Sequence, residues 1–275
     1  MSDVWTITRH LSPLRRLAVL DLINRTEAAI GREALDENRR RGVIHDWPGE
    51  HWLKEDAGLH GYAHVTDTQV PCVEMCGGGL DEDLLKGILA VHPVVDWWLR
   101  DSPGHAHAMR TIRLMTRALP APRLEVPEGA LVRHFRPGLD DEAWLALNNA
   151  AFPDHPEQGQ WTQHDLESRT REPWFDPSGF VLLEIDDELA ASCWTKVHEL
   201  HPERPGEIYV ISVDPKFQRR GLGRIILSEG LATLRSKGVS AAMLFVDADH
   251  DQATNLYEHF GFRVAREDQI LRFYA

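Results

Sequence analysis

Apolar residues follow two spacings along the second half of the chain, and the order of these spacings predicts a mixed α/β fold. Apolar side chains at every second position, or in short unbroken runs, are typical of strands, whereas spacings of three and four are typical of helices. Strand patterns are found at 130–135, 179–185, 189–197, 207–213, 241–246 and 262–274. Helix patterns are found at 140–152, 162–170, 221–237 and 254–260. We therefore expect a mixed central sheet flanked by helices.

A proline-rich segment separates this half of the chain from the first half. Residues 119–128 include three prolines, and proline fixes φ and lacks a backbone donor, so an extended connector is expected there. The 275 residues are also enough for two domains. We predict a first domain at 1–118, a linker at 119–128 and a second domain at 129–275.

Short sequence echoes on the two sides of the linker indicate duplicated domains. The string RHLSP at 9–13 returns as RHFRP at 133–137, and the same offset aligns Ile23-Asn24 with Leu147-Asn148. In each half the echo predicts a short strand, a proline turn and a helix. Two matches in one register favour an internal repeat over chance.

The charge of the chain is acidic and uneven. The formal net charge is −13, of which −3 falls on residues 1–127 and −10 on residues 128–275. This balance argues against nucleic acid or an anionic membrane as a partner. It is compatible with a cationic substrate, although solvated acidic surface is the more common cause. No apolar run reaches the roughly 18 residues of a membrane span, and the first residues do not form a secretory signal.

The cysteines predict neither a disulfide framework nor a metal site. Cys72, Cys76 and Cys193 are too few for a framework, which favours a reducing cytoplasm. Cys72 and Cys76 have a spacing compatible with metal binding, but no second pair accompanies them. We expect a cytoplasmic, metal-free monomer.

One glycine-bearing turn carries the most specific chemistry. The predicted strand 207–213 leads into a turn and then the N-terminus of the predicted helix 221–237, with arginines at 219, 220 and 224. Unpaired backbone N–H groups and the helix dipole favour anions at such a terminus, and glycine permits close approach of a phosphate. The alternative is an ordinary capped helix with a basic first turn.

Two strings in this region resemble the GNAT superfamily of N-acetyltransferases. The string QRRGLG at 218–223 is similar to the superfamily's Gln/Arg-x-x-Gly-x-Gly/Ala motif, and NLYEHFGF at 255–262 is similar to its second conserved element. The resemblance implies acetyl-CoA as donor, with pantetheine inserted where two parallel strands splay at a bulge. The residues it implies in coenzyme binding are Ile211, Ser212, Val213, Gln218, Arg219, Arg220, Gly221, Leu222, Gly223, Arg224, His250, Asp251, Gln252, Ala253, Thr254 and Asn255.

Further strings narrow the resemblance to the mycothiol synthase family, strongly over 130–275 and weakly over 1–125. They are NNAAF at 148–152, HPEQGQWT at 155–162, EPWFDP at 172–177, WTK at 194–196 and FVDAD at 245–249. The resemblance implies two tandem GNAT N-acetyltransferase domains. It also implies cysteinyl-glucosaminyl-inositol as the small-molecule substrate, acetylated on its cysteinyl amine. The implied substrate-binding residues are Glu33, Glu157, Lys196 and Phe245.

Amine acetylation requires a base and a proton donor, and two residues fit these roles under the resemblance. Glu207, at the start of its strand, is the expected base, and the alternative is a solvated glutamate at a strand end. Tyr257 is the expected proton donor to the CoA sulfur, and the alternative is a tyrosine packed on the sheet. A backbone N–H near Val213 is the expected carbonyl polariser. Trp161 and Trp174 could stack on a sugar or pack in the protein.

Two departures from the family pattern affect the expected site. Phe245 stands where we expect a tyrosine, so a phenol contact to substrate would be absent. In the first half, the string CGGGLDED at 76–83 occupies the place of a pyrophosphate loop, but it lacks arginine and ends in three acids. Like charges would repel a pyrophosphate there. We therefore expect a degenerate, noncatalytic N-terminal copy.

Two other functions remain open at this point. The second-half motifs are compatible with acetylation of another amine, such as a peptide N-terminus or an aminoglycoside. A non-catalytic acetyl-CoA-binding regulatory module is also compatible with the turn at 218–224. Retention of Glu207 and Tyr257 favours an enzyme.

Overall fold

The computed structural model describes residues 4–275 except 106, 154, 156, 200 and 202. Contacts divide the chain into two compact units. Unit 1 combines Met1–Arg113 with Asp247–Asp249 and Arg266–Ala275, and unit 2 combines Leu114–Val246 with His250–Ala265. This division differs from the predicted domains: residues 247–249 and 266–275 lie in unit 1, and residues 114–128, which include the predicted linker, lie in unit 2.

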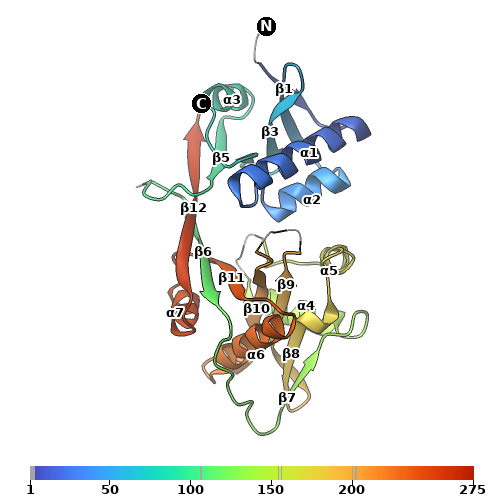
Figure 1. Cartoon of the computed structure of the whole chain (residues 1–275), viewed down its shortest axis with the longest axis vertical. Helices are drawn as coiled ribbons and strands as arrows, with labels where there is room; N and C mark the ends of the chain where they lie inside the picture. The colour runs from blue at the N-terminus through green and yellow to red at the C-terminus, as the bar shows by residue number, and fades with distance from the viewer. Residues whose placement is uncertain (1–3, 106, 154, 156, 200, 202) are drawn as a thin grey trace. The chain divides into compact units, whose positions relative to one another are not determined.

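Unit 2 contains the elements predicted from apolar spacing (Figure 1). In chain order they are β7 (Ala130–His134), α4 (Asp141–Ala151), α5 (Gln163–Thr170), β8 (Phe180–Ile185), β9 (Glu188–Val197), β10 (Gly206–Val213), α6 (Leu222–Ser236), β11 (Ala241–Asp247), α7 (Asp251–His259) and the start of β12 (Arg263–Tyr274). The predicted elements are confirmed with small shifts at their ends. The largest shift is in α7, which begins three residues earlier than predicted because the His250 side chain accepts a hydrogen bond from the backbone N–H of Ala253.

The sheet of unit 2 is mixed, as predicted. β7, β8, β9 and β10 are neighbours in that order and run antiparallel, whereas β10 and β11 are parallel. β6 (Arg110–Ala118) is the next neighbour of β11.

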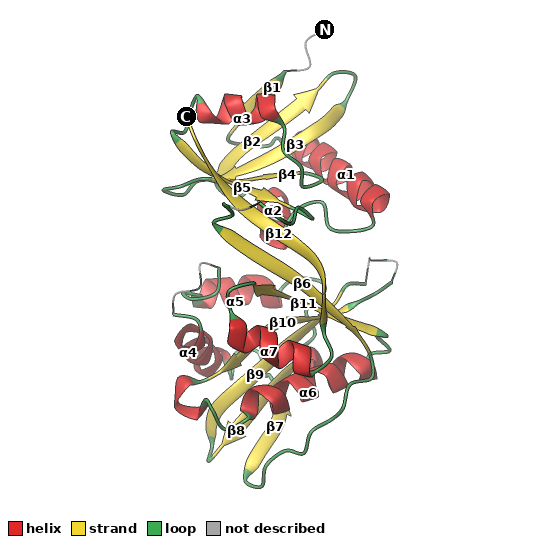
Figure 2. Cartoon of the chain, turned by 90° about the vertical axis from the view of Figure 1, so that its left-hand side faces the viewer, coloured by secondary structure: helices red, strands yellow, loops and turns green. Residues whose placement is uncertain are grey.

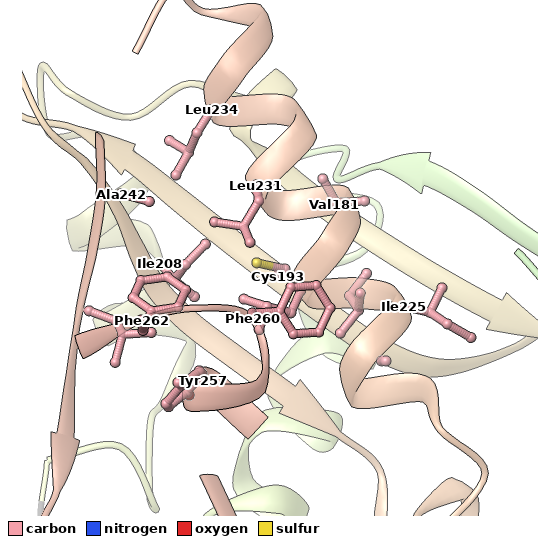
Figure 3. Close-up of a cluster of buried hydrophobic side chains, with 14 of the residues drawn as sticks. Val181, Cys193, Ile208, Ile225, Leu231, Leu234, Ala242, Tyr257, Phe260 and Phe262 are labelled. Carbon is pink, nitrogen blue, oxygen red and sulfur yellow. The ribbon is translucent and has the colours of Figure 1, made fainter. Parts of the chain in front are cut away.

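Helix α6 packs closely on one face of this sheet (Figure 3). A Cβ atom at Gly230 would lie 2.3 Å from Cys193 Sγ, and a Cβ atom at Gly206 would lie 2.5 Å from Leu234 Cδ2. These two glycines let helix and sheet backbones approach. The predicted linker packs on the same core through Leu124 and neighbouring residues, and Arg123 forms an ion pair with Glu229 of α6 at 2.7 Å. The predicted linker is therefore extended, as expected, but it packs against unit 2.

An aromatic cluster covers the other face of the sheet. Trp194 on β9 stacks on Phe180 with ring centroids 4.5 Å apart, and Trp144 of α4 meets it edge-on at 5.6 Å. Trp161 and Trp174 also contact the Trp194 ring. Both tryptophans therefore contribute to the packing of this face, Trp161 as a buried and Trp174 as a half-buried side chain.

Unit 1 repeats the element order of unit 2, as the sequence echoes predicted (Figure 2). Its elements are β1 (Trp5–Thr8), α1 (Pro13–Ile30), α2 (Glu37–His45), β2 (Gly49–Glu55), β3 (Leu59–Thr66), β4 (Cys72–Met75), α3 (Glu82–Leu89), β5 (Val94–Leu99) and the start of β6. In both units a strand and two helices precede three strands, a helix and a further strand. The described residues between β5 and β6 form no helix that corresponds to α7.

The last strand of the chain completes the sheet of unit 1. Residues Gln269–Tyr274 of β12 pair antiparallel with Val94–Leu99 of β5, so β5 has β4 on one side and β12 on the other. Among the described residues, no helix is both long and apolar enough to cross a membrane.

Two buried histidines face each other on neighbouring strands of unit 1. His51 on β2 is the cross-strand partner of His64 on β3, and their ring centroids lie 5.3 Å apart. His51 Nδ1 bonds to the Tyr62 hydroxyl at 2.8 Å. Within the described part of the chain, neither ring nitrogen of His64 has a hydrogen-bond partner. Burial lowers the pKa of His64 to about 3.

The contact at Gly230 generates a stability prediction. Gly230→Ala should lower the free energy of unfolding by about 1–3 kcal/mol because the new methyl overlaps the Cys193 thiol. The double variant Gly230→Ala/Cys193→Ala lacks the thiol that the new methyl overlaps. Its loss of unfolding free energy should therefore be smaller than the sum of the losses in Gly230→Ala and in Cys193→Ala. Gly58→Ala, where a Cβ meets no atom within 4 Å, is the control. Additive losses in urea denaturation would contradict this contact.

The His64 environment generates a pH prediction. The pKa of His64 is lower in the folded chain than its ordinary value near 6.5, so the unfolded chain binds more protons between those values. The free energy of unfolding should therefore be highest above about pH 6.5 and should fall as the pH decreases below that value. His64 should contribute up to about 1.4 kcal/mol of this fall per pH unit. Urea denaturation at pH 5 and 7 should show a smaller difference in His64→Asn than in wild type. An equal difference would refute the assignment, and His134→Asn, at an exposed position, is the control.

Candidate active site

The parallel strands β10 and β11 part immediately after Glu207. Their paired residues are Gly206 with Ala242 and Glu207 with Met243, and no further pair joins them within the described residues. The register between β10 and β9 also shifts between Ile208 and Val210, which marks a β-bulge. A strand edge without a partner presents N–H and C=O groups to an extended ligand. The structure thus contains the splayed strands and bulge that the resemblance implied.

Three residues implied in coenzyme binding lie along this open edge. Ile211, Ser212 and Val213 pair with β9 on one side of β10, and no described strand residue pairs with them on the other. The Ser212 side chain is buried and bonds to Ser192 Oγ at 2.7 Å, which in turn accepts a bond from Trp144 Nε1 at 3.0 Å. This chain of bonds anchors the strand from the aromatic face.

The turn after β10 leads directly into an uncapped helix N-terminus. Arg219 and Gly221 both have positive φ, 61° and 80°, and α6 begins at Leu222 without a side-chain hydrogen bond to its first turn. Successive residues of this kind form a concave group of backbone N–H donors that suits an anion. Gln218, Arg219 and Arg220 are exposed. The Arg220 guanidinium lies 5.2 Å from the centre of the Phe217 ring.

Helix α7 closes against this turn. Gly223 lies where a Cβ atom would be 3.6 Å from Leu256 of α7 and 3.8 Å from Val213 of β10. Arg224 donates to His259 Nε2 of α7 at 2.7 Å. The remaining residues implied in coenzyme binding form the first turn of α7 and its cap: His250, Asp251, Gln252, Ala253, Thr254 and Asn255.

Glu207 is a buried carboxylate rather than a solvated one. It lies at the last paired position of β10, the exposed fraction of the whole residue is 7%, and its Oε2 bonds to His198 Nε2 at 2.7 Å. Burial acts to raise the pKa of Glu207, but the His198 hydrogen bond and charge, with help from Lys196, outweigh burial and lower it. The side chain is therefore ionised near neutral pH and positioned by partners.

Lys196 is the cross-strand partner of Glu207 and is also buried. Its exposed fraction is 8%, and its ammonium lies 4.8 Å from the Trp174 ring centre and 5.7 Å from that of Tyr209. Lys196 is therefore not a surface lysine. The Tyr209 hydroxyl accepts a bond from Arg169 Nε at 3.2 Å, so a second cation supports the same ring.

The other residues implied in substrate binding lie at three separate places. Glu157 follows α4 in a loop, with its carboxylate 3.5 Å from His155 Nδ1 and its backbone carbonyl bonded to Trp161 Nε1 at 2.7 Å. Phe245 is an exposed residue of β11. Glu33 belongs to unit 1, in the bend between α1 and α2.

Tyr257 of α7 lies in the hydrophobic core of unit 2 (Figure 3). Its exposed fraction is 6%, and its ring meets Phe262 edge-on with centroids 5.9 Å apart. Burial raises the pKa of Tyr257, and the neighbouring Cys193 raises it further. The phenol is therefore held in its protonated form, which a proton donor requires, in a packed position.

The equivalent region of unit 1 is occupied by side chains of the chain itself. Glu74 lies at the last parallel pair of β4 with β5, the position that Glu207 holds in β10, but it is fully buried and bonded to Arg100 Nε at 2.7 Å and to the backbone N–H of Asp36 at 2.9 Å. The N-terminus of α3 is capped by Asp81, whose carboxylate accepts bonds from the backbone N–H groups of residues 83 and 84. The anion position of α3 thus holds a carboxylate.

Sequence reasoning missed three residues that surround Glu207 and Lys196: His198, Tyr209 and Arg169. His198 had a usable signal, because it follows Lys196 by two positions and so shares its face of the strand. Tyr209 and Arg169 had none, since their contacts depend on the bulge and on how α5 packs. Among the described residues, no three His, Cys, Asp or Glu side chains are grouped as a metal site would require.

Comparison with known proteins supports the geometry. The Acetyltransferase (GNAT) family matches residues 142–262. A protein of Streptomyces griseus subsp. griseus named mycothiol acetyltransferase is 39% identical over 93% of this chain and 91% of its own length, and one of Geodermatophilus obscurus with the same name is 39% identical over 92% of each.

Solved structures of low sequence identity share the fold. A GCN5-related N-acetyltransferase from Sphaerobacter thermophilus has a TM-score of 0.65 at 21% identity, covering 100% of this chain and 96% of its own. A tandem GNAT protein from the clavulanic acid biosynthesis pathway has a TM-score of 0.68 at 12% identity, covering 98% of each chain. The predicted acetyltransferase fold is confirmed. The chain belongs to the mycothiol acetyltransferase family, within the GNAT N-acetyltransferases.

Proposed function

We propose that this chain transfers the acetyl group of acetyl-CoA to the cysteinyl amine of cysteinyl-glucosaminyl-inositol, giving mycothiol and CoA. The observation that carries the proposal is the buried, ionised Glu207 at the point where β10 and β11 part, beside an uncapped basic helix N-terminus. Relatives about 39% identical over nearly the whole chain, named mycothiol acetyltransferase, support the substrate.

Each feature of unit 2 suits one part of acetyl-CoA. The open edge of β10 at 211–213 offers backbone groups to the pantetheine amides. The N–H groups at 219–224, with Arg219 and Arg220, suit the pyrophosphate. Bound in this way, acetyl-CoA would supply its acetyl thioester next to Glu207.

Glu207 and Tyr257 then accept and donate the protons of the reaction. Glu207 takes one proton from the substrate ammonium, which leaves a neutral amine to form the C–N bond with the thioester carbon. A backbone N–H near Val213 stabilises the oxyanion that develops. As the C–S bond breaks, Tyr257 gives a proton to the leaving thiolate and regains one from the attacking nitrogen. One proton remains on Glu207 and is released to solvent.

The substrate contacts proposed for this reaction are Glu157, Lys196, Phe245 and, from unit 1, Glu33. Lys196 is the best supported of them, because its ammonium is held beside the base by two aromatic rings. Phe245 retains an aromatic surface without a phenol hydroxyl.

We propose that unit 1 does not bind acetyl-CoA. In α3 the first backbone N–H groups are already bonded to Asp81, whereas α6 has no such cap. The carboxylate that corresponds to Glu207 is locked by Arg100. A coenzyme would have to displace both contacts and overcome the repulsion of the acids at 81–83.

The first prediction from this proposal concerns turnover. Purified protein with acetyl-CoA and cysteinyl-glucosaminyl-inositol should release CoA and give a product one acetyl group heavier. Glu207→Gln should lower kcat by roughly 10²–10⁴ with acetyl-CoA affinity nearly intact, because only the base is lost. Glu199→Gln, a nearby glutamate on the surface, is the control.

The outcomes separate the alternatives. Acetylation of a peptide N-terminus or an aminoglycoside in preference to this substrate would favour another acetyltransferase. CoA binding without any product would favour a regulatory module. Wild-type kcat in Glu207→Gln would remove Glu207 from the mechanism.

The second prediction concerns the number of coenzyme sites. Isothermal titration calorimetry should give one acetyl-CoA per chain. Arg219→Ala/Arg220→Ala should weaken binding about 10-fold or more through loss of charge-assisted bonds. Arg235→Ala, in the last turn of the same helix, should leave it unchanged. Two tight sites per chain would contradict the proposal for unit 1.

A further inference from the structure

His198 has a backbone position fixed by the pairing of β9 with β10. It follows directly after Val197, the partner of Gly206, and its backbone N–H donates to the Pro205 carbonyl at 3.0 Å, which continues the antiparallel ladder. Lys196 lies opposite Glu207, and side chains two positions apart share a face. His198 is therefore the diagonal neighbour of Glu207 on that face.

The side chains of this diagonal pair meet in a short hydrogen bond. His198 Nε2 and Glu207 Oε2 are 2.7 Å apart, and the exposed fractions of the two side chains are 13% and 10%. A bond this short between partly desolvated groups is typical of a charge-assisted contact. It engages Oε2, and no hydrogen bond from the described residues engages Oε1, which can therefore meet a substrate amine.

Two charged groups that act on Glu207 come from the neighbouring strand β9. β9 presents His198 and Lys196, and these are the two groups that lower the pKa of Glu207 against the effect of burial. On the other neighbouring strand, β11, the paired residue is Met243, which carries no charge. The Lys196 ammonium lies over two aromatic rings, and His198 is in direct contact with the carboxylate through its hydrogen bond.

We propose that His198 is a positioning residue for the base: its Nε2–H holds Oε2 of Glu207, keeps the carboxylate ionised in a buried place, and directs Oε1 to the substrate ammonium. This inference rests on the proposed role of Glu207 in acetyl transfer. It predicts that His198 acts through the protonation state of the base. A purely structural residue would instead affect activity equally at all pH values.

The test uses the full-length protein and two readouts. The first is the pKa of Glu207, followed by NMR titration of protein with ¹³C-labelled glutamate carboxylates and assigned by the signal that Glu207→Gln removes. The second is the acidic limb of the pH profile of kcat/KM. In His198→Ala both should move to higher pH by about 1 unit or more, because burial then acts on Glu207 with only Lys196 opposing it.

Two further variants make the result specific. His198→Gln, which retains an N–H donor without the charge, should give an intermediate shift and partial recovery of kcat/KM at neutral pH. His201→Asn changes a nearby histidine with no contact to Glu207 among the described residues, and it should leave both readouts at the wild-type values. A circular dichroism melt confirms that each variant folds.

The outcomes distinguish this inference from the proposed function. A Glu207 titration that is the same in wild type and His198→Ala would overturn the inference. A uniform fall in kcat/KM with an unmoved limb would also overturn it. Absence of acetylated product from the wild type would instead refute the proposed function, while the NMR titration would still report whether His198 controls Glu207.

Discussion

The site of this protein depends on the parting of two parallel strands. Up to Glu207 and Met243 the backbones of β10 and β11 bond to each other, and beyond this pair β9 is the one strand of the described residues that pairs with β10. Unpaired backbone groups are costly to leave without water or a partner, so this edge calls for a ligand with amides of its own. The catalytic carboxylate proposed here lies at the vertex, where the sheet still holds it rigidly.

The two copies of the fold show how the same framework either accepts or excludes an anion. Both have a parallel strand pair, a glycine turn and a helix. In unit 2 the helix begins at a glycine with no side-chain cap, whereas in unit 1 Asp81 caps α3 and Arg100 neutralises Glu74. In unit 1 the Asp81 carboxylate accepts hydrogen bonds from the first backbone N–H groups of α3, so this helix N-terminus does not need a bound anion.

The aromatic cluster around Trp194 packs one face of the sheet of unit 2 and also positions a proposed substrate contact. Trp194 binds the two sides of the cluster together, and its neighbours Trp174 and Tyr209 hold the Lys196 ammonium beside Glu207. A buried lysine needs compensation for lost water, and the faces of two rings contribute to it. The same packing fixes the distance between the proposed base and a proposed substrate contact.

Local patterns in the sequence determined most of the elements and the kind of chemistry. Strand and helix spacing predicted the strands and α-helices from β7 to β12 to within three residues at their ends, because burial of one face imposes its period on nearby residues, whereas β6 was not predicted. The turn at 218–224 pointed to an anion for a local reason too, since glycines, arginines and a helix start are adjacent in the chain.

Tertiary structure alone decided which distant residues meet. It paired the C-terminal strand with β5, bound the proline-rich segment to α6, and turned Glu207 and Lys196 inward. It also brought His198 to the carboxylate. Such partners are chosen by register, bulges and packing between segments far apart in the chain, and no local spacing records them.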